Sequence, residues 1–263
     1  MKFAPIALLS LVALGPSCGS DKAARVQGGP QFVIKNKKPA APKNDDPYKT
    51  MTVENEVGVM DTDDVEATIQ EHFDEVRGCY SRAGKAQRYA GGKVLLRFMV
   101  GADGTTEDVR VLESTLGNYE VERCLVEVGR RIHFHAPNGN KPTTFEYPVE
   151  FRSAAGAAVL DLDGGAKVEH DLASLLPQLA ACGAVADGQV NAIVWVQPNG
   201  VPGSVGLATE AAVDEDAGDC VVQTIRAFHM SFGLPGHFVR ANLHLPMTLA
   251  TAEASHRARH RHH

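Results

Sequence analysis

The sequence lacks an apolar run long enough to cross a membrane as a helix. The run from Phe3 to Leu14, near the N-terminus of the 263-residue chain, is shorter than the ~20 residues that a spanning helix needs. Lys2 places a positive charge in front of this run. A short apolar run of this kind is typical of a cleaved export signal, so we interpret residues 1–17 as a signal peptide.

The sequence also lacks the short motifs of common enzyme classes. It contains no Walker loop and no H-E-x-x-H metalloprotease motif. Pro202–Gly206 is close to a nucleophile elbow, but it lacks the first glycine and falls in an expected strand. Asp161–Gly164 is too short for a calcium loop and is interpreted as part of a linker. We therefore predict a non-enzymatic protein with no catalytic residues and no cofactor.

No C-x-x-C pair occurs, which argues against a thiol redox motif or a zinc knuckle. Besides Cys18, the chain has four cysteines, at Cys79, Cys124, Cys182 and Cys220. An exported protein meets an oxidising compartment, in which paired thiols become disulfides. Four cysteines allow three pairings, and the alternative is that all four are buried free thiols.

Cys18 stands directly after the export signal. This position resembles the lipobox of bacterial lipoproteins, in which the cysteine is lipidated and becomes the mature N-terminus. Gly15 and Pro16 depart from that pattern, and the alternative is an ordinary secretory signal cleaved near Ser17. We predict an exported lipoprotein, held by Cys18 in a membrane, expected to be the outer membrane, and facing the periplasm.

Residues 18–60 have the composition of a tether. Between Asp21 and Lys49, seven Lys and Arg residues stand against three Asp residues, and large apolar side chains are few. Such a segment cannot bury enough surface to fold, so we expect it to be disordered. The net charge of the chain is −6. A positive tether therefore leaves the folded part acidic, which argues against a nucleic-acid partner.

The remainder of the chain contains one order of parts used twice. Gly104 precedes Cys124 by 20 positions, and Gly200 precedes Cys220 by 20 positions. Each glycine follows Asp or Asn in a turn, and each second cysteine is followed by a proline in an expected strand, Pro148 or Pro246. The predicted domains are a first unit at 61–152, a linker at 153–167, a second unit at 168–249 and a tail at 250–263.

Each unit is predicted to contain a helix, a β-hairpin, a second helix and a final strand, which gives an α+β fold with two tandem small domains. The helical and alternating apolar patterns place these elements at 65–80, 94–111, 121–128 and 145–151 in the first unit, and at 172–182, 190–207, 217–224 and 239–247 in the second. Asp63 and Glu66 resemble a capping box. Pro177 indicates that its helix starts late, capped by Ser174, or is kinked.

Each cysteine of a unit falls on the apolar face of a different helix. Two helices packed on one face of a three-stranded sheet can bring these positions together. We therefore predict disulfides Cys79–Cys124 and Cys182–Cys220, one inside each unit. A bridge that closes a loop of this length can contribute roughly 3–4 kcal/mol, mainly by restricting the unfolded chain.

Five short motifs follow one another in the first unit, at Val76–Tyr80, Gly92–Val94, Val100–Gly104, Glu113–Asn118 and Val121–Leu125. Together they resemble the AgmX/PglI-type C-terminal domain, which is similar to the TonB/TolA C-terminal fold. The resemblance covers about residues 62–152, and the second unit is interpreted as a degenerate copy from its spacing alone. The resemblance implies a periplasmic module that binds envelope partners and belongs to an envelope transport or motility machine.

Pro148 and Pro246 occupy matching places in the two expected final strands. Proline has no N–H for a ladder and is confined to sheet edges, so each final strand is predicted to be an edge. An edge can accept an extended peptide of an envelope protein by strand addition. Glu146 and Glu150 are expected to face outward and to favour a basic peptide. The alternative is that these residues guard the edge against aggregation.

Histidines suggest a third possibility, a periplasmic metal-binding protein. His133 and His135 would share one face of a strand. The tail carries further histidines at His256, His260, His262 and His263, and such tracts can hold a metal ion. Because nothing in the sequence fixes a ligand geometry, the main interpretation of the tail is a solvated basic end.

Overall fold

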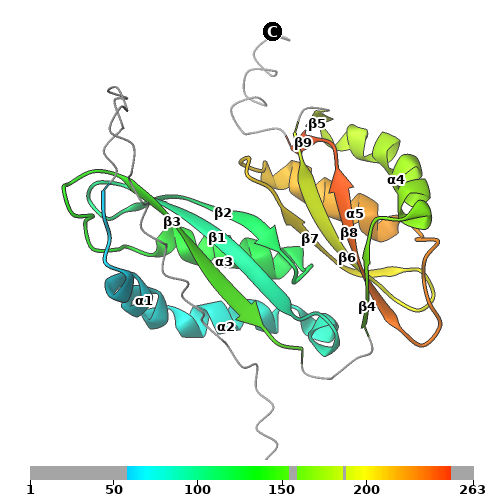
Figure 1. The fold of residues 1–263 in the computed structure, drawn as a ribbon, viewed down its shortest axis with the longest axis horizontal. Coiled ribbons are helices and arrows are strands. Elements are labelled where there is room, and N and C mark those ends of the chain that lie inside the picture. Colours follow the sequence, from blue (N-terminus) through cyan, green and yellow to red (C-terminus); the bar gives the residue numbers. More distant parts are fainter. Residues whose placement is uncertain (1–57, 154–158, 186–187, 250–263) are drawn as a thin grey trace, which may run out of the picture.

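The computed structural model describes residues 58–153, 159–185 and 188–249, which form two α+β units side by side (Figure 1). No helix within these residues has the length and apolar character to cross a membrane. The predictions for the signal peptide, for Cys18, for residues 18–57 of the tether and for the tail lie outside the described residues.

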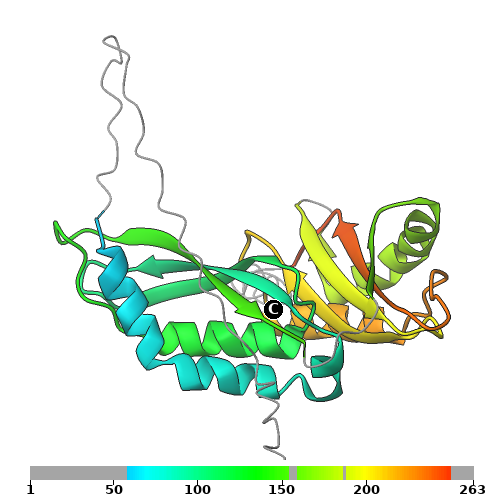
Figure 2. The ribbon, with the colours of Figure 1, turned by 60° about the horizontal axis from the view of Figure 1, so that its bottom comes forward.

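The first unit is a three-stranded antiparallel sheet with its helices on one face (Figure 2). The strand order is β2-β1-β3, so β2 and β3 are the two edges. The elements of this unit are α1 (Thr62–Glu71), α2 (Phe73–Ser81), the 3-10 helix η1 (Gly84–Arg88), β1 (Gly92–Val100), β2 (Thr106–Ser114), α3 (Tyr119–Arg131) and β3 (Thr143–Phe151).

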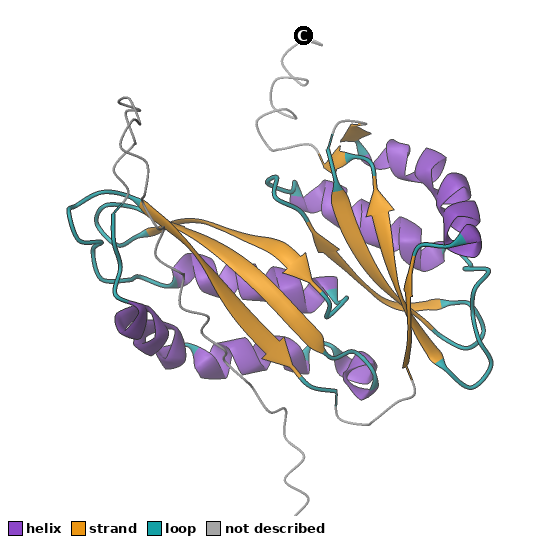
Figure 3. Cartoon of the chain, in the orientation of Figure 1, coloured by secondary structure: helices purple, strands orange, loops and turns teal. Residues whose placement is uncertain are grey.

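The second unit has a separate four-stranded sheet of order β4-β8-β6-β7 and a small two-stranded sheet of β5 and β9 (Figure 3). Strand β4 runs parallel to β8, while the other neighbours are antiparallel. The elements are β4 (Val159–Asp163), α4 (Ala166–Leu179), the 3-10 helix η2 (Ala180–Cys182), β5 (Ala184–Val185), β6 (Val190–Val196), β7 (Pro202–Ala208), α5 (Glu215–Ala227), β8 (Phe238–Leu245) and β9 (Thr248–Leu249).

The two units share the contacts that fix their hairpins. The turn glycines have left-handed backbone, with φ of 90° at Gly104 and 83° at Gly200. Each turn glycine's carbonyl accepts a hydrogen bond from the segment after the second helix. Phe134 N donates to Gly104 O at 2.9 Å, and Met230 N donates to Gly200 O at 2.9 Å. The equal spacing seen in the sequence therefore corresponds to a repeated three-dimensional arrangement.

The helices differ from the sequence-based expectations in three places. The side chain of Asp61 caps α1 and accepts from Asp63 N at 2.8 Å, so Asp63 and Glu66 do not form the predicted capping box. The single helix expected over 65–80 is interrupted at His72. Helix α4 begins directly after Gly165, whose φ is 101°, rather than late, and Ser174 lies inside it and donates to His170 O.

The linker prediction was wrong for residues 159–163. These residues form β4, whose parallel pairing with β8 extends the second sheet by one strand. Strand β8 is therefore covered on both sides, and the prediction that it is a sheet edge was wrong as well. Pro246 lies just beyond the end of β8, so its missing N–H interrupts no ladder bond in that strand.

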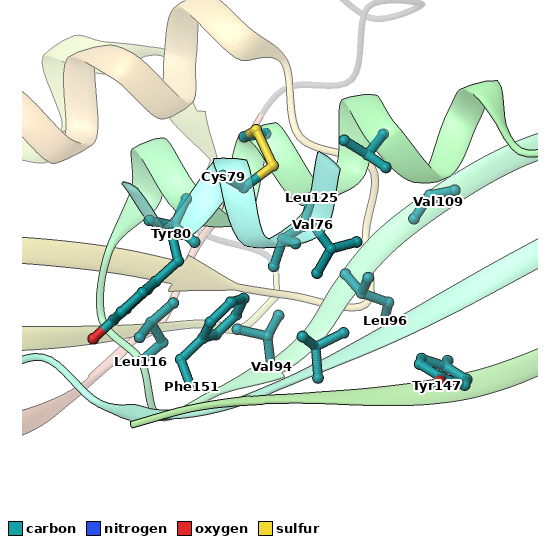
Figure 4. Packing of buried hydrophobic residues seen from close by; sticks show 14 of the residues in the cluster. Val76, Cys79, Tyr80, Val94, Leu96, Val109, Leu116, Leu125, Tyr147 and Phe151 are labelled. Carbon is teal, nitrogen blue, oxygen red and sulfur yellow. A yellow bond between two sulfur atoms is a disulfide. The ribbon is translucent and has the colours of Figure 1, made fainter. Parts of the chain in front are cut away.

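Both predicted disulfides are present, and each joins two helical segments over its sheet. Cys79 of α2 binds Cys124 of α3, and Cys182 of η2 binds Cys220 of α5, both with Cα atoms 5.5 Å apart. Around the first bridge the buried apolar side chains of α2 and α3 face the sheet (Figure 4). Tyr80 next to this bridge stacks on Phe151 of β3 with ring centroids 4.8 Å apart.

We expect the double variant Cys79→Ala, Cys124→Ala to lose roughly 3–4 kcal/mol of unfolding free energy, because the bridge restricts the unfolded chain. Urea denaturation of the full chain measures this loss. In excess reductant the unaltered chain and the variant should unfold at similar urea concentrations, which is the control. A disulfide-linked peptide joining one unit to the other would contradict the assigned pairing.

Candidate functional site

The edges of the two sheets that face each other are β2 and β7, and the units join there. Just beyond β7, Thr209 N donates to Val111 O of β2 at 3.0 Å. Arg110 Nη1 donates to the main-chain oxygen of Glu210 at 2.9 Å. One edge of each sheet is thus covered by the other unit.

The loop before α3 packs directly on the second sheet. Trp195 Nε1 donates to Leu116 O at 2.7 Å, and Ser204 Oγ donates to Gly117 O at 2.6 Å. Asn118, whose side chain caps α3, also donates from Nδ2 to Ser204 Oγ at 3.0 Å. These loop residues belong to the Glu113–Asn118 motif, so residues that carried the family resemblance contact the second unit.

Glycines allow this close approach. Gly117 has a φ of 65°, and a Cβ there would lie 2.7 Å from Ile193 Cγ2 and 2.8 Å from the Trp195 ring. A Cβ on Gly206 would overlap Glu122 Oε1. The Pro202–Gly206 segment, which resembled an incomplete nucleophile elbow, is strand β7 in this contact, and its Ser204 is a hydrogen-bonding residue of the interface.

Glu122 is a buried carboxyl at the centre of the contact, and it is 1% exposed. Its carboxyl accepts hydrogen bonds from Ser114 Oγ at 2.5 Å and from Asn118 N at 3.3 Å within the first unit. It also accepts from Leu207 N of β7 at 2.8 Å. Burial raises the pKa of Glu122 to about 7, and the hydrogen bonds, which favour the ionised form, offset only part of this rise.

Ion pairs and rings surround this buried centre. Arg226 of α5 pairs with Glu120 of α3 at 2.6 Å. Arg123 of α3 pairs with Glu215 at 3.0 Å. On the side of η1, the Tyr89 ring lies 4.2 Å from that of Phe238 and 5.4 Å from that of Trp195, measured between centroids. The contact therefore has an apolar and hydrogen-bonded interior and a charged rim, as stable interfaces do.

Strand β3 is the edge of the first sheet that pairs with no further strand among the described residues. Along it the alternate residues Tyr147, Val149 and Phe151 are buried, and Phe145 is partly buried and packs on the same core. Glu146 and Glu150 lie on the opposite face of the strand, but Glu146 is paired with Arg97 of β1 at 3.1 Å. Glu146 was expected to favour a basic peptide, and this cross-strand pair reduces the availability of its carboxylate.

The backbone direction of β3 follows from its neighbour. Lys93 O accepts from Thr115 N, so Lys93 and the alternate residue Leu95 direct their backbone groups toward β2. Leu95 stands opposite Pro148. Pro148 and its alternate neighbours Glu146 and Glu150 therefore direct their backbone groups to the free side of β3. The missing N–H of Pro148 interrupts that row of exposed donors at its middle.

A cleft of about 620 Å³ lies between the outer face of the first sheet and the second unit. Leu95, Leu112 and Glu113 line it from the first sheet, with Arg97 and Glu146 beside them. The second unit contributes Gln189, Asn191, Thr209, Glu210 and Thr248 among its lining residues. The cleft thus combines two leucines with several carboxylates and neutral polar groups.

The structure does not bring the predicted histidines into a metal centre. His133 and His135 flank the buried Phe134, and both are exposed. Within the described ranges no group of three or more His, Cys, Asp or Glu side chains is placed to hold a metal ion. His256, His260, His262 and His263 lie outside those ranges.

Sequence reasoning missed Trp195, Ser204 and Glu122 as contact residues. One signal was present in β6, where Ile193 and Trp195 are apolar although they alternate with the core-facing Val194. A strand that is apolar on both faces is typical of burial on both sides.

Comparison with protein-family models, curated proteins and solved structures found no match to this chain.

The buried carboxyl predicts a pH-dependent stability. An acid whose pKa is higher in the folded chain than in the unfolded chain loses its favourable contribution as the pH rises. For Glu122 the pKa rises from 4.5 to about 7, so unfolding free energy should fall over that interval. The fall should be about 3 kcal/mol at 1.36 kcal/mol per pKa unit.

The matched variant is Glu122→Gln, which keeps the shape of the side chain and cannot ionise. Urea denaturation of both chains from pH 4 to pH 8 measures the difference in slope. The unaltered chain should lose stability relative to the variant between about pH 4.5 and about 7. Parallel pH profiles for the two chains would contradict the assigned pKa.

Proposed function

We propose that this protein is an exported, lipid-anchored module of a bacterial cell envelope that binds an extended segment of an envelope protein along β3. The observation that carries the proposal is the edge of β3, which pairs with no other strand in the described ranges. The facing edges β2 and β7 are used in the contact between the units, and β8 is covered by β4. The other edge of the second sheet, β4, has five residues, whereas β3 has nine and offers the longer row of backbone groups. Strand addition at β3 needs no rearrangement of these contacts.

The resemblance of residues 62–152 to the AgmX/PglI-type C-terminal domain supports this function. The disulfides support an oxidising compartment, because paired thiols persist there. The second unit repeats the order of hairpin, helix and strand, and we infer that it is a degenerate TonB-like copy. In this proposal the second unit acts as a brace that covers β2, so that the first unit presents one free edge.

The anchor is tested by Cys18→Ala. If Cys18 is lipidated, this variant should move from the membrane fraction to the soluble periplasmic fraction, because the export signal remains and the acyl chains are lost. Fractionation followed by immunoblotting measures the change. Ser17→Ala is the control and should stay with the membrane. An unlipidated N-terminus in mass spectra of the unaltered protein would contradict the anchor.

The edge is tested by comparing Glu146→Pro with Glu146→Ala in the full chain. Both variants remove the carboxylate and its pair with Arg97, but only proline removes a backbone donor from the free side of β3. Crosslinking in intact envelopes, with quantification of the protein captured by the unaltered chain, measures binding. We expect capture to fall at least tenfold for the proline variant and much less for the alanine variant.

Equal capture by the two variants would contradict strand addition. It would favour the alternative interpretation, in which Pro148 and the glutamates only guard the edge. Circular dichroism and urea midpoints should be similar for the two variants, because the altered N–H makes no bond within the sheet. This comparison separates a binding defect from a folding defect.

A further inference from the structure

The cleft between the units is acidic. Three glutamates line it, at Glu113, Glu146 and Glu210, against the single guanidinium of Arg97. Arg97 is held by Glu146 at 3.1 Å, and in the described part of the chain Glu113 and Glu210 have no ion pair. The nearby Arg110 binds the main-chain oxygen of Glu210, and its own charge is matched by Asp108 at 2.5 Å. Two carboxylates therefore remain without a partner charge.

The lining of the cleft suits long cationic side chains. Leu95 is partly buried and Leu112 is 9% exposed, and both line the cleft together with the carboxylates. Arginine side chains lay their apolar stems along such surfaces while the guanidinium reaches an acidic group. Asn191 and Thr209 add polar groups at the wall formed by the second unit. The chemistry that fits is an arginine-rich peptide segment.

The chain carries such a segment next to this cleft. Strand β9 is the last described element, and its Thr248 lines the cleft. Residues 250–263 follow directly and contain Arg257, Arg259 and Arg261, with four histidines and a single acidic residue, Glu253. Fourteen residues can extend up to about 50 Å, so these arginines can reach any part of the cleft.

We propose that the arginine-rich segment 256–263 occupies the cleft between the units of its own chain. Attachment through six intervening residues gives the segment an effective concentration of about 1 mM at the cleft. A peptide from outside would therefore compete poorly for the same carboxylates. This interaction is separate from strand addition at β3 and does not depend on it.

The test uses the full chain and a dye-labelled synthetic peptide with the sequence of residues 250–263. In the tail variant, Arg257→Gln, Arg259→Gln and Arg261→Gln remove the competing charges. The labelled peptide should bind the tail variant at least tenfold more tightly than the unaltered chain if its Kd is below about 0.1 mM, since the attached segment competes at about 1 mM. Fluorescence anisotropy at low ionic strength measures both affinities.

The carboxylates are tested in the tail variant. Adding Glu113→Gln and Glu210→Gln should weaken peptide binding at least tenfold, because the uncompensated charges are lost. The matched control adds Glu71→Gln and Glu169→Gln, which remove the same charge from exposed positions outside the cleft, on α1 and α4. Binding of the peptide to this control should change less than twofold. In 0.5 M salt, binding of the peptide to the tail variant should weaken strongly.

Two outcomes would overturn the proposal. If the peptide binds the tail variant and the unaltered chain equally well, the attached segment does not occupy the cleft, and a cationic segment of another molecule is its ligand. If the peptide binds neither chain, or binds the tail variant regardless of Glu113 and Glu210, the cleft is not the site for this segment.

Discussion

The contact between the loop before α3 and the second sheet determines which surfaces of the molecule remain available. Trp195, Ser204 and Leu207 meet main-chain or carboxyl oxygens of Leu116, Gly117 and Glu122 in this contact. Each of these polar groups is buried, and an unpaired buried group costs about 1–3 kcal/mol. Separation of the units would therefore expose Trp195 and leave several donors and acceptors to be solvated together. The geometry favours one fixed arrangement of two sheets over two independently moving domains.

Much of the fold is encoded in local patterns. The turns at Asp103-Gly104 and Asn199-Gly200, with strands alternating on either side, identify both hairpins, and helical spacing places the cysteines over the sheets. Strand β4 is not visible in this way. Leu160 is 42% exposed, the segment is short, and its partner Val239 is far along the chain. Its strand conformation depends on parallel pairing with β8, which no local pattern reports.

The candidate binding edge could be predicted from the sequence only in part. Pro148 identifies β3 as an edge because proline removes a ladder donor, whereas Pro246 carries no such information since it lies beyond its strand. The pair of Glu146 with Arg97 depends on strand register, which fixes which side chains stand opposite each other. Glu122 belongs to an amphipathic helix, and a glutamate in such a helix is usually exposed. Glu122 is buried because the second unit packs against α3 and β7 donates a hydrogen bond to its carboxyl.

The positions of the disulfides have a mechanical consequence. Tension applied to the chain at Gly58 would first break the short bridge between Val59 and Asn138 and then unwind α1. Peeling would stop at Cys79, because the covalent bond passes the force directly to Cys124. Residues 80–123, which include β1 and β2, would carry no tension. The second bridge shields residues 183–219, with β6 and β7, in the same way. Both strands that join the units therefore lie inside covalently closed loops that a pull on the termini does not stretch.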